Sequence, residues 1–239
     1  MKVKLLFDLA MLNDVQQAIS VVLDFSKVPH LLVVGGTSSG KTTFLRMLIG
    51  KLALSNKKII VCDYKSDPSF FEFDGLSNYY RADCCKEGFQ KVYDEFIDRQ
   101  QNFIIDKDEI CLIFDEYAFF INRLSKKEAD EVKKQLAEML MAGRTFGIHI
   151  IVALQRGDAS YFPNGARDNF GMRLGLGSLK EESKKMLFED EKDNIDAQST
   201  GKGYLLVDGQ RLRKIICPPI TKEEYLLEVS KQALSDYTE

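Results

Sequence analysis

Short apolar runs recur along the chain, and each is followed by glycine or a polar residue. They are rich in Val, Ile and Leu and show no alternation with polar residues. This pattern is typical of parallel strands that are buried on both faces of a sheet. The runs therefore predict the central strands of a mainly parallel sheet at residues 31–34, 59–63, 110–116 and 147–156.

Segments between these runs carry apolar residues at helical spacing, with polar residues on the remaining positions. Ser125 is followed three residues later by Glu128, and Thr221 by Glu224, so each pair predicts a capping box that opens a helix. Gly143 ends the first of these two helices. Helices are thus predicted at residues 43–54, 86–101, 125–142 and 180–188, and from residue 221 onwards.

Further strands are predicted near the C-terminal end at residues 170–177, 204–207 and 211–217. Asp208 and Gly209 separate the last two strands and predict a hairpin turn. The alternation of strands and helices indicates an α/β fold with a mainly parallel central sheet flanked by helices, plus a C-terminal β-hairpin. We expect one domain over residues 1–239, with a lead-in segment (1–27), a core (28–219) and a C-terminal helix (220–239).

A glycine-rich stretch at residues 35–42 lies between the first apolar run and the helix that follows it. It has the pattern G-x-x-x-x-G-K-[ST], in which the backbone curls so that successive N–H groups point at phosphate oxygens. Lys41 is expected to meet the β- and γ-phosphates of ATP, and Thr42 to ligate Mg²⁺. The predicted nucleotide-binding residues are Gly35, Gly36, Thr37, Ser38, Ser39, Gly40, Lys41, Thr42, Thr43 and Asp115.

Two adjacent carboxylates end the strand predicted at residues 110–116. The carboxyl ends of parallel strands border the ligand crevice of such sheets. Asp115 is expected to hold Mg²⁺ through its water shell, and Glu116 to polarise the water that attacks the γ-phosphate. The glutamate favours hydrolysis over transfer to a second substrate, so the sequence predicts an ATPase with Lys41 and Glu116 as catalytic residues.

The composition of the chain limits the kinds of partner, metal site and membrane contact that the sequence predicts. The 239 residues carry a formal net charge of −3, which gives no overall basic signature for nucleic acid, so any polyanion must be held by local clusters. Five cysteines without a C-x-x-C pair indicate neither a disulfide framework nor a metal site. No apolar run approaches the roughly 20 residues that cross a bilayer, so we expect no membrane insertion and a cytoplasmic location.

Several segments together resemble the motor domain of the FtsK/SpoIIIE family of DNA translocases, within the FtsK and HerA group of ring ATPases. Residues 28–37 (VPHLLVVGGT) are similar to the family's approach to its phosphate loop. Residues 143–156 (GRTFGIHIIVALQR) are similar to its G-R-A-x-G-I-H-L-I-L-A-T-Q-R segment, and Gly201–Gly203 lies where the family has a late G-x-G turn. The resemblance implies a RecA-like P-loop NTPase fold.

The resemblance also implies a homo-hexameric ring that binds ATP at subunit interfaces and double-stranded DNA in its channel. The strand that ends at Gln155 would lie between the two site strands, with Gln155 as a sensor of the γ-phosphate. An arginine from the neighbouring subunit would complete the site, and Arg173 is the first choice by motif position. Arg144 and Arg156 are the alternatives. Channel contacts are expected from loops 64–68 and 157–167.

Some family features are not found. Ser38 replaces a common glycine and Gly157 a common proline, and the chain shows no membrane anchor, no preceding motor lobe and no winged helix. We therefore expect a DNA motor for plasmid, conjugative-element or phage DNA, docked on a membrane-anchored or relaxase partner. The alternatives are a protein-translocating ATPase like those of type VII secretion, or a scaffold that assembles with ATP.

Overall fold

The parallel strands form where the apolar runs predict them. This computed structural model describes residues 1–105, 108–163, 165–208 and 210–235. Five parallel strands lie side by side in the order β3 (Leu31–Gly35), β7 (Ile148–Leu154), β6 (Ile110–Asp115), β4 (Lys58–Asp63) and β5 (Tyr79–Arg81). Each pair is parallel. β3, β6 and β7 are buried along their whole length, as expected for strands covered on both faces.

Antiparallel strands complete the sheet on the other side of β3. β8 (Met172–Leu176) is parallel to β3 and antiparallel to β9 (Lys202–Val207), which pairs with β10 (Arg213–Ile216). The predicted β9–β10 hairpin is confirmed, although Gly209 of its predicted turn lies outside the described residues. β1 (Lys2–Asp8) pairs with β10, and β2 (Ser20–Asp24) pairs with β1 at the sheet edge. The described residues thus form one ten-stranded sheet that includes part of the lead-in segment.

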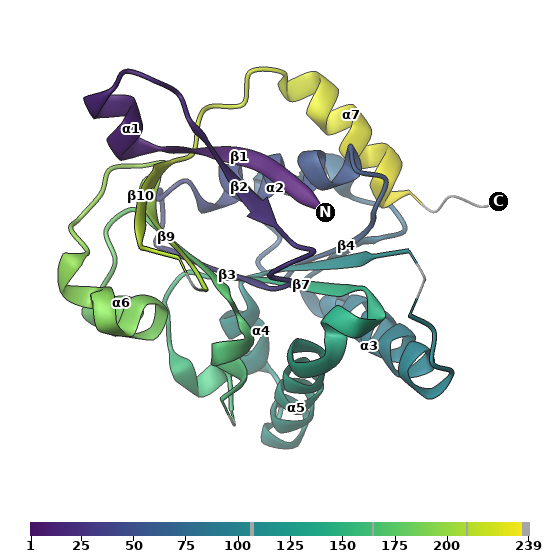
Figure 1. The fold of residues 1–239 in the computed structure, drawn as a ribbon. Helices are drawn as coiled ribbons and strands as arrows, with labels where there is room; N and C mark the ends of the chain where they lie inside the picture. Colours follow the sequence, from purple (N-terminus) through teal and green to yellow (C-terminus); the bar gives the residue numbers. More distant parts are fainter. Residues whose placement is uncertain (106–107, 164, 209, 236–239) are drawn as a thin grey trace.

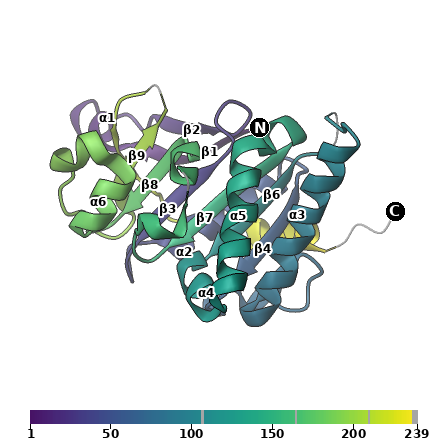
Figure 2. The same ribbon diagram turned by 90° about the horizontal axis from the view of Figure 1, so that it is seen from below.

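Helices cover both faces of this sheet (Figures 1 and 2). One face packs against α2 (Lys41–Ala53) and α7 (Glu223–Leu234). The other packs against α3 (Cys85–Gln101), α4 (Tyr117–Arg123), α5 (Lys126–Ala142) and α6 (Glu181–Phe188). The short α1 (Leu9–Asp14) connects β1 to β2. Short 3₁₀-helices occur at Pro68–Phe73, Ala82–Cys84, Gly143–Phe146, Ala159–Tyr161, Ala166–Asn169 and Glu189–Asn194.

The two predicted capping boxes have different outcomes. At α5 the box is confirmed, because Ser125 and Glu128 each bond to the other's backbone N–H. At α7 the prediction from Thr221 was wrong, since the helix begins at Glu223 with Lys222 as its cap and without a side-chain capping bond. The helix packs on α2, where Leu226 lies so close to Gly50 that a Cβ at Gly50 would come within 2.9 Å of it.

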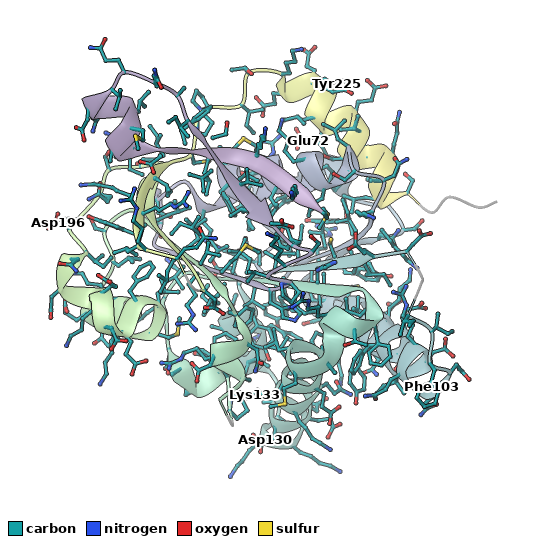
Figure 3. The ribbon with its side chains drawn as sticks, in the orientation of Figure 1. Glu72, Phe103, Asp130, Lys133, Asp196 and Tyr225 are labelled. Atoms are coloured by element: carbon teal, nitrogen blue, oxygen red, sulfur yellow. The ribbon has the colours of Figure 1, made fainter. Side chains whose placement is uncertain are left out.

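Charged side chains on the outer face of α5 follow the pattern of a solvated helix. Asp130 is exposed at the outer end of α5 (Figure 3), whereas Val132 and Leu136 are buried against the sheet. Lys133 is half-buried and donates to the carbonyl of Ser160 at 3.1 Å. Phe103, just beyond α3, is 85 % exposed. Among the described residues, no helix is both long enough and apolar enough to span a bilayer.

Candidate nucleotide-binding and hydrolysis site

The glycine-rich loop joins the carboxyl end of β3 to the N-terminus of α2. Gly40 adopts a left-handed backbone with φ of 94°, which glycine tolerates without strain. No side chain caps α2, so its first-turn N–H groups remain available to an anion, which the helix dipole also favours. The buried hydroxyl of Ser39 has no hydrogen-bond partner among the described residues. These free donors fit a bound phosphate chain.

A later loop supports this one from the side. The N–H of Gly201 donates to the carbonyl of Ser39 at 2.9 Å, and the hydroxyl of Thr200 donates to the carbonyl of Ser38 at 2.8 Å. Gly201 directly precedes β9 and belongs to the segment (Gly201–Gly203) that resembles the family's late glycine turn, and Thr200 is the residue before it. The sequence pattern indicated the turn, but the contact between two loops about 160 residues apart required the fold.

Lys41 meets both predicted carboxylates at the centre of the site. Its ammonium group bonds to Asp115 and lies 2.8 Å from Glu116 Oε1. All three side chains are buried. Burial alone would lower the pKa of Lys41, but the two carboxylates outweigh this effect and raise it, so the lysine is charged. Burial raises the pKa of Asp115, although the charge of Lys41 beside it opposes this shift.

Glu116 has an unusual backbone. β6 ends at Asp115, and Glu116 follows with φ of 57° and ψ of 40°, a left-handed conformation that costs a non-glycine residue about 1–3 kcal/mol. Its N–H donates to Asp115 Oδ1 at 3.0 Å. The turn directs the Glu116 side chain back to Lys41 rather than along the strand. Such strain is often kept where a side chain must be placed for chemistry.

Gln155 reaches the same site from the end of β7. Its side-chain amide donates to the hydroxyl of Thr37 at 2.8 Å. β7 lies between β3 and β6, as the resemblance implied, so Gln155 follows the strand that separates the loop from the carboxylates. Gln155 therefore lines the same cavity as the glycine-rich loop and the two carboxylates.

These residues line one cavity of about 280 Å³. It brings together all the predicted nucleotide-binding residues with Glu116 and Gln155. The hydroxyl of Thr42 and the carboxylate of Asp115 are hard oxygen ligands, which suit Mg²⁺ when phosphate oxygens and water complete its coordination. Among the described residues there is no cluster of three or more His, Cys, Asp or Glu that could hold a metal alone.

The three arginines occupy different places. Arg173 is outside this cavity, three residues before the end of β8 that pairs with Gly35, and it donates to the carbonyl of Phe170 at 2.9 Å. Arg144 is exposed after α5. Arg156 lines a neighbouring cavity of about 830 Å³ that also contacts Glu116 and Gln155. Within one chain, Arg156 is therefore nearer to the site than Arg173.

Lys65 and Asp67 also line the nucleotide cavity. Residues 64–67 follow the carboxyl end of β4, and their sequence position left two interpretations open, a place near the nucleotide or a solvated loop. Their loop is held by Asp63 at the end of β4, which accepts the N–H of Asp67 at 2.7 Å and the hydroxyl of Tyr79 at 3.0 Å. Burial raises the pKa of Asp63 to about 6. The position of Asp63 at a strand end was the available sequence signal, because strand ends border the crevice.

Comparisons with known proteins agree with this geometry. The family model described as "FtsK/SpoIIIE family" matches residues 4–79. The chain is 27 % identical to the FtsK domain-containing protein YdcQ of Bacillus subtilis over 88 % of this chain and 47 % of YdcQ. It is 26 % identical to the DNA translocase FtsK of Staphylococcus aureus over 65 % of this chain and 24 % of that protein. The chain thus spans less than half the length of these two relatives.

Solved structures share the fold at lower identity. The cytoplasmic domain of the type VII secretion ATPase EccC from Thermomonospora curvata has a TM-score of 0.73 and 18 % identity, over 99 % of this chain and 31 % of that one. The pCW3 conjugation coupling protein TcpA with ATPγS has a TM-score of 0.72 and 15 % identity, over 95 % of this chain and 70 % of that one. The similarity confirms the expected RecA-like ATPase fold.

Proposed function

Because this chain carries an FtsK/SpoIIIE-type P-loop ATPase domain, we propose that it couples ATP hydrolysis to the movement of double-stranded DNA. The observation that carries the hydrolytic part is the contact of Lys41 with Asp115 and Glu116 at the mouth of an uncapped helix. The contact brings a phosphate-binding cation and a candidate base into the same cavity, where the base could reach a water that attacks the terminal phosphate.

Nucleotide binding changes the partners of Lys41. The β- and γ-phosphate oxygens compete for its ammonium group, which now bonds to the two carboxylates. Once Lys41 turns to the phosphates, Glu116 is free to accept a proton from the attacking water. Mg²⁺, held by Thr42 and Asp115, would neutralise charge that develops on the phosphates. Gln155 would contact the terminal phosphate in place of Thr37 and so register its loss.

The DNA cargo rests on the relatives' activities and on the loops around the site. One relative is named as a DNA translocase, and one structural neighbour as a conjugation coupling protein. Loops 64–68 and 157–167 are our candidates for channel contacts, apart from residue 164, which is outside the described residues. We propose a hexameric ring in which Arg173 of one subunit reaches the nucleotide of the next, serving plasmid, conjugative-element or phage DNA.

ATP turnover of the full chain, measured with and without double-stranded DNA at two salt concentrations, tests this function. We expect DNA to raise turnover and higher salt to weaken the stimulation, because phosphate contacts release counterions. Turnover that DNA leaves unchanged at both salt concentrations would contradict the DNA motor and leave a simple ATPase. Absence of turnover under every condition would contradict the hydrolytic assignment itself.

A protein cargo is the second candidate, since the fold is shared with the type VII secretion ATPase EccC. The same assay separates the two functions. Stimulation by an unfolded or signal-bearing polypeptide, without stimulation by DNA, would favour protein translocation. The site chemistry is common to both candidates, so Lys41 and Glu116 keep their roles in either.

A further inference from the structure

A basic groove lies away from the nucleotide, where the antiparallel strands meet the end of α2. Its volume is about 780 Å³. Cations reach it from four segments: Lys2 and Lys4 from β1, Lys27 after β2, Lys51 from the last turn of α2, and Arg213 from β10. Asp24 is the one carboxylate among its described lining residues. A chain of net charge −3 thus concentrates positive charge in one hollow.

Most of these cations have no acidic partner. Asp24 lies 3.9 Å from Lys2, while its carboxylate also accepts the hydroxyl and the N–H of Ser26 at 2.6 and 3.2 Å. No ion pair within the described part of the chain joins Lys4, Lys27, Lys51 or Arg213 to a carboxylate. Surface lysines elsewhere are often neutralised, for example Lys86 by Glu128 at 2.7 Å.

We propose that this groove, defined by Lys2, Lys4, Lys27, Lys51 and Arg213, binds the phosphate backbone of double-stranded DNA. Duplex DNA carries about one negative charge per 1.7 Å of its axis, so several cations in one groove meet several phosphates at once. Ser20 and Gln210 add neutral hydrogen-bond donors of the kind that contact phosphates. The inference rests on the proposed DNA cargo and adds a second DNA-contacting surface to the channel loops at residues 64–68 and 157–167.

The fold links this groove to the nucleotide loop through one hairpin. Thr200 and Gly201 bond to the phosphate loop and lead directly into β9. β9 pairs with β10, which carries Arg213, and the N–H of Cys217 just after β10 donates back to the carbonyl of Gly201 at 2.7 Å. A shift of the phosphate loop on nucleotide binding would therefore act on the same two strands that help to form the groove.

An anionic membrane is a less suitable occupant. Binding at a membrane interface depends on buried apolar area as well as on charge. Among the exposed large apolar side chains of the described residues, Val22 alone lines the groove, and it is 38 % exposed. Contact with the phosphate backbone of a nucleic acid needs cations and hydrogen-bond donors. The groove has five cations and one carboxylate among its described lining residues.

The test uses the full chain with Lys4→Gln and Lys27→Gln together. Both lysines are exposed, and no described carboxylate pairs with them. Fluorescence anisotropy with a short labelled DNA duplex measures binding across a salt series. We expect binding to weaken by roughly tenfold, and the slope of log K against log salt to become shallower by about 2, one for each phosphate that a lysine no longer neutralises.

The matched control is Lys126→Gln with Lys127→Gln, which removes the same charge from the exposed start of α5. This control should bind the duplex as the wild type does, and thermal unfolding should show both double variants folded. If the groove variant and the control lose affinity equally, or neither does, the groove is not the DNA site. In that case DNA-stimulated ATP turnover of the wild type would still support the motor.

The remaining outcomes separate the inference from the function it rests on. The groove variant could lose DNA binding while DNA leaves the ATP turnover of the wild type unchanged. That result would support the groove as a DNA-binding site and overturn the proposed DNA motor. A wild type that binds no duplex overturns the groove as a DNA site. Binding to vesicles of anionic phospholipid that disappears in the groove variant would overturn it in favour of a membrane surface.

Discussion

The two halves of the sheet differ in direction, burial and chemistry. In the parallel half, β3, β7, β6 and β4 are covered by helices on both faces and end at the nucleotide cavity. In the antiparallel half, β1 and β2 bury one face, with Val3 and Leu23, and expose the other, with Lys2 and Lys4. The site residues follow the first pattern and the basic groove follows the second.

This difference shows how one sheet can divide two tasks. Parallel strands bring their carboxyl ends to one edge, so residues far apart in sequence, such as Lys41 and Glu116, meet there in a buried cluster. Antiparallel strands with one solvated face can present charge to a large partner without disturbing the core. Substitutions at Lys41 and Glu116 in the parallel half should change catalysis, whereas substitutions of the groove lysines in the antiparallel half should change cargo binding.

Replacing Lys41 with alanine should have the largest effect in the parallel half. The change removes the cation expected at the phosphates and leaves Asp115 and Glu116 buried without their partner. We expect phosphate release to fall by about 10³-fold or more, on the scale of losing preorganised charge stabilisation. Lys127→Ala, on an exposed helix turn, is the control and should keep wild-type turnover. Equal turnover in both variants would refute the role of Lys41.

Arg173 offers a test of assembly across the two halves, since β8 joins them. Arg173→Ala should lower turnover by about 10³-fold if the residue acts as an arginine finger for its neighbour. Mixing this variant with Lys41→Ala should then restore part of the activity, because some interfaces combine an intact Lys41 with an intact Arg173. The readout is phosphate release as a function of mixing ratio. A mixture no more active than its components would rule out action in trans.

Gln155→Ala should have a smaller effect than the loss of either cation. Its side chain contacts Thr37 and lines the nucleotide cavity, but it carries no charge. We expect turnover to fall about 10- to 100-fold, as for the loss of one neutral hydrogen bond to a developing charge with some compensation by water. Thr37→Val is the matched variant, because it removes the hydroxyl that accepts the hydrogen bond from Gln155 and leaves Gln155 itself in place. Wild-type turnover of Gln155→Ala would contradict the sensor role.

Asp63→Asn should change stability more than catalysis. Its folded-state pKa is raised to about 6, so the folded state keeps a proton that the unfolded state loses near pH 4. The wild type therefore loses stability as pH rises between about 4 and 6, by up to about 3 kcal/mol, while the asparagine variant lacks this loss. Urea unfolding at several pH values measures the difference between the two proteins. A difference that is constant with pH would contradict the buried carboxyl.

Local patterns predicted the parallel half well. Apolar runs and the glycine-rich loop each lie within about ten consecutive residues, and the chemistry of Lys41, Asp115 and Glu116 follows from strand ends that share one edge. α4 was not predicted, because its start at the left-handed Glu116 shows no capping signal in the sequence. The start of α7 was mispredicted, because the local signal of Thr221 is not used and Lys222 is the cap, without a side-chain hydrogen bond.

The antiparallel half depended on long-range pairing. β1 pairs with β10 about 200 residues later, and nothing in the sequence of either strand indicates that the two pair. The basic groove combines residues 2, 4, 27, 51 and 213, which come from four segments far apart in the sequence. The contact of Gln155 with Thr37 likewise follows from the placement of β7 beside β3. Such features arise when the sheet is assembled.

The most direct test of the hydrolytic site is Glu116→Gln, measured for ATP binding and for phosphate release in the same preparation. Glutamine keeps the size of the side chain but is a poor proton acceptor. We predict ATP binding close to that of the wild type and turnover lower by about 10²- to 10⁴-fold, the contribution of a positioned general base. Turnover equal to that of the wild type would show that water is activated elsewhere and would contradict the assignment of Glu116.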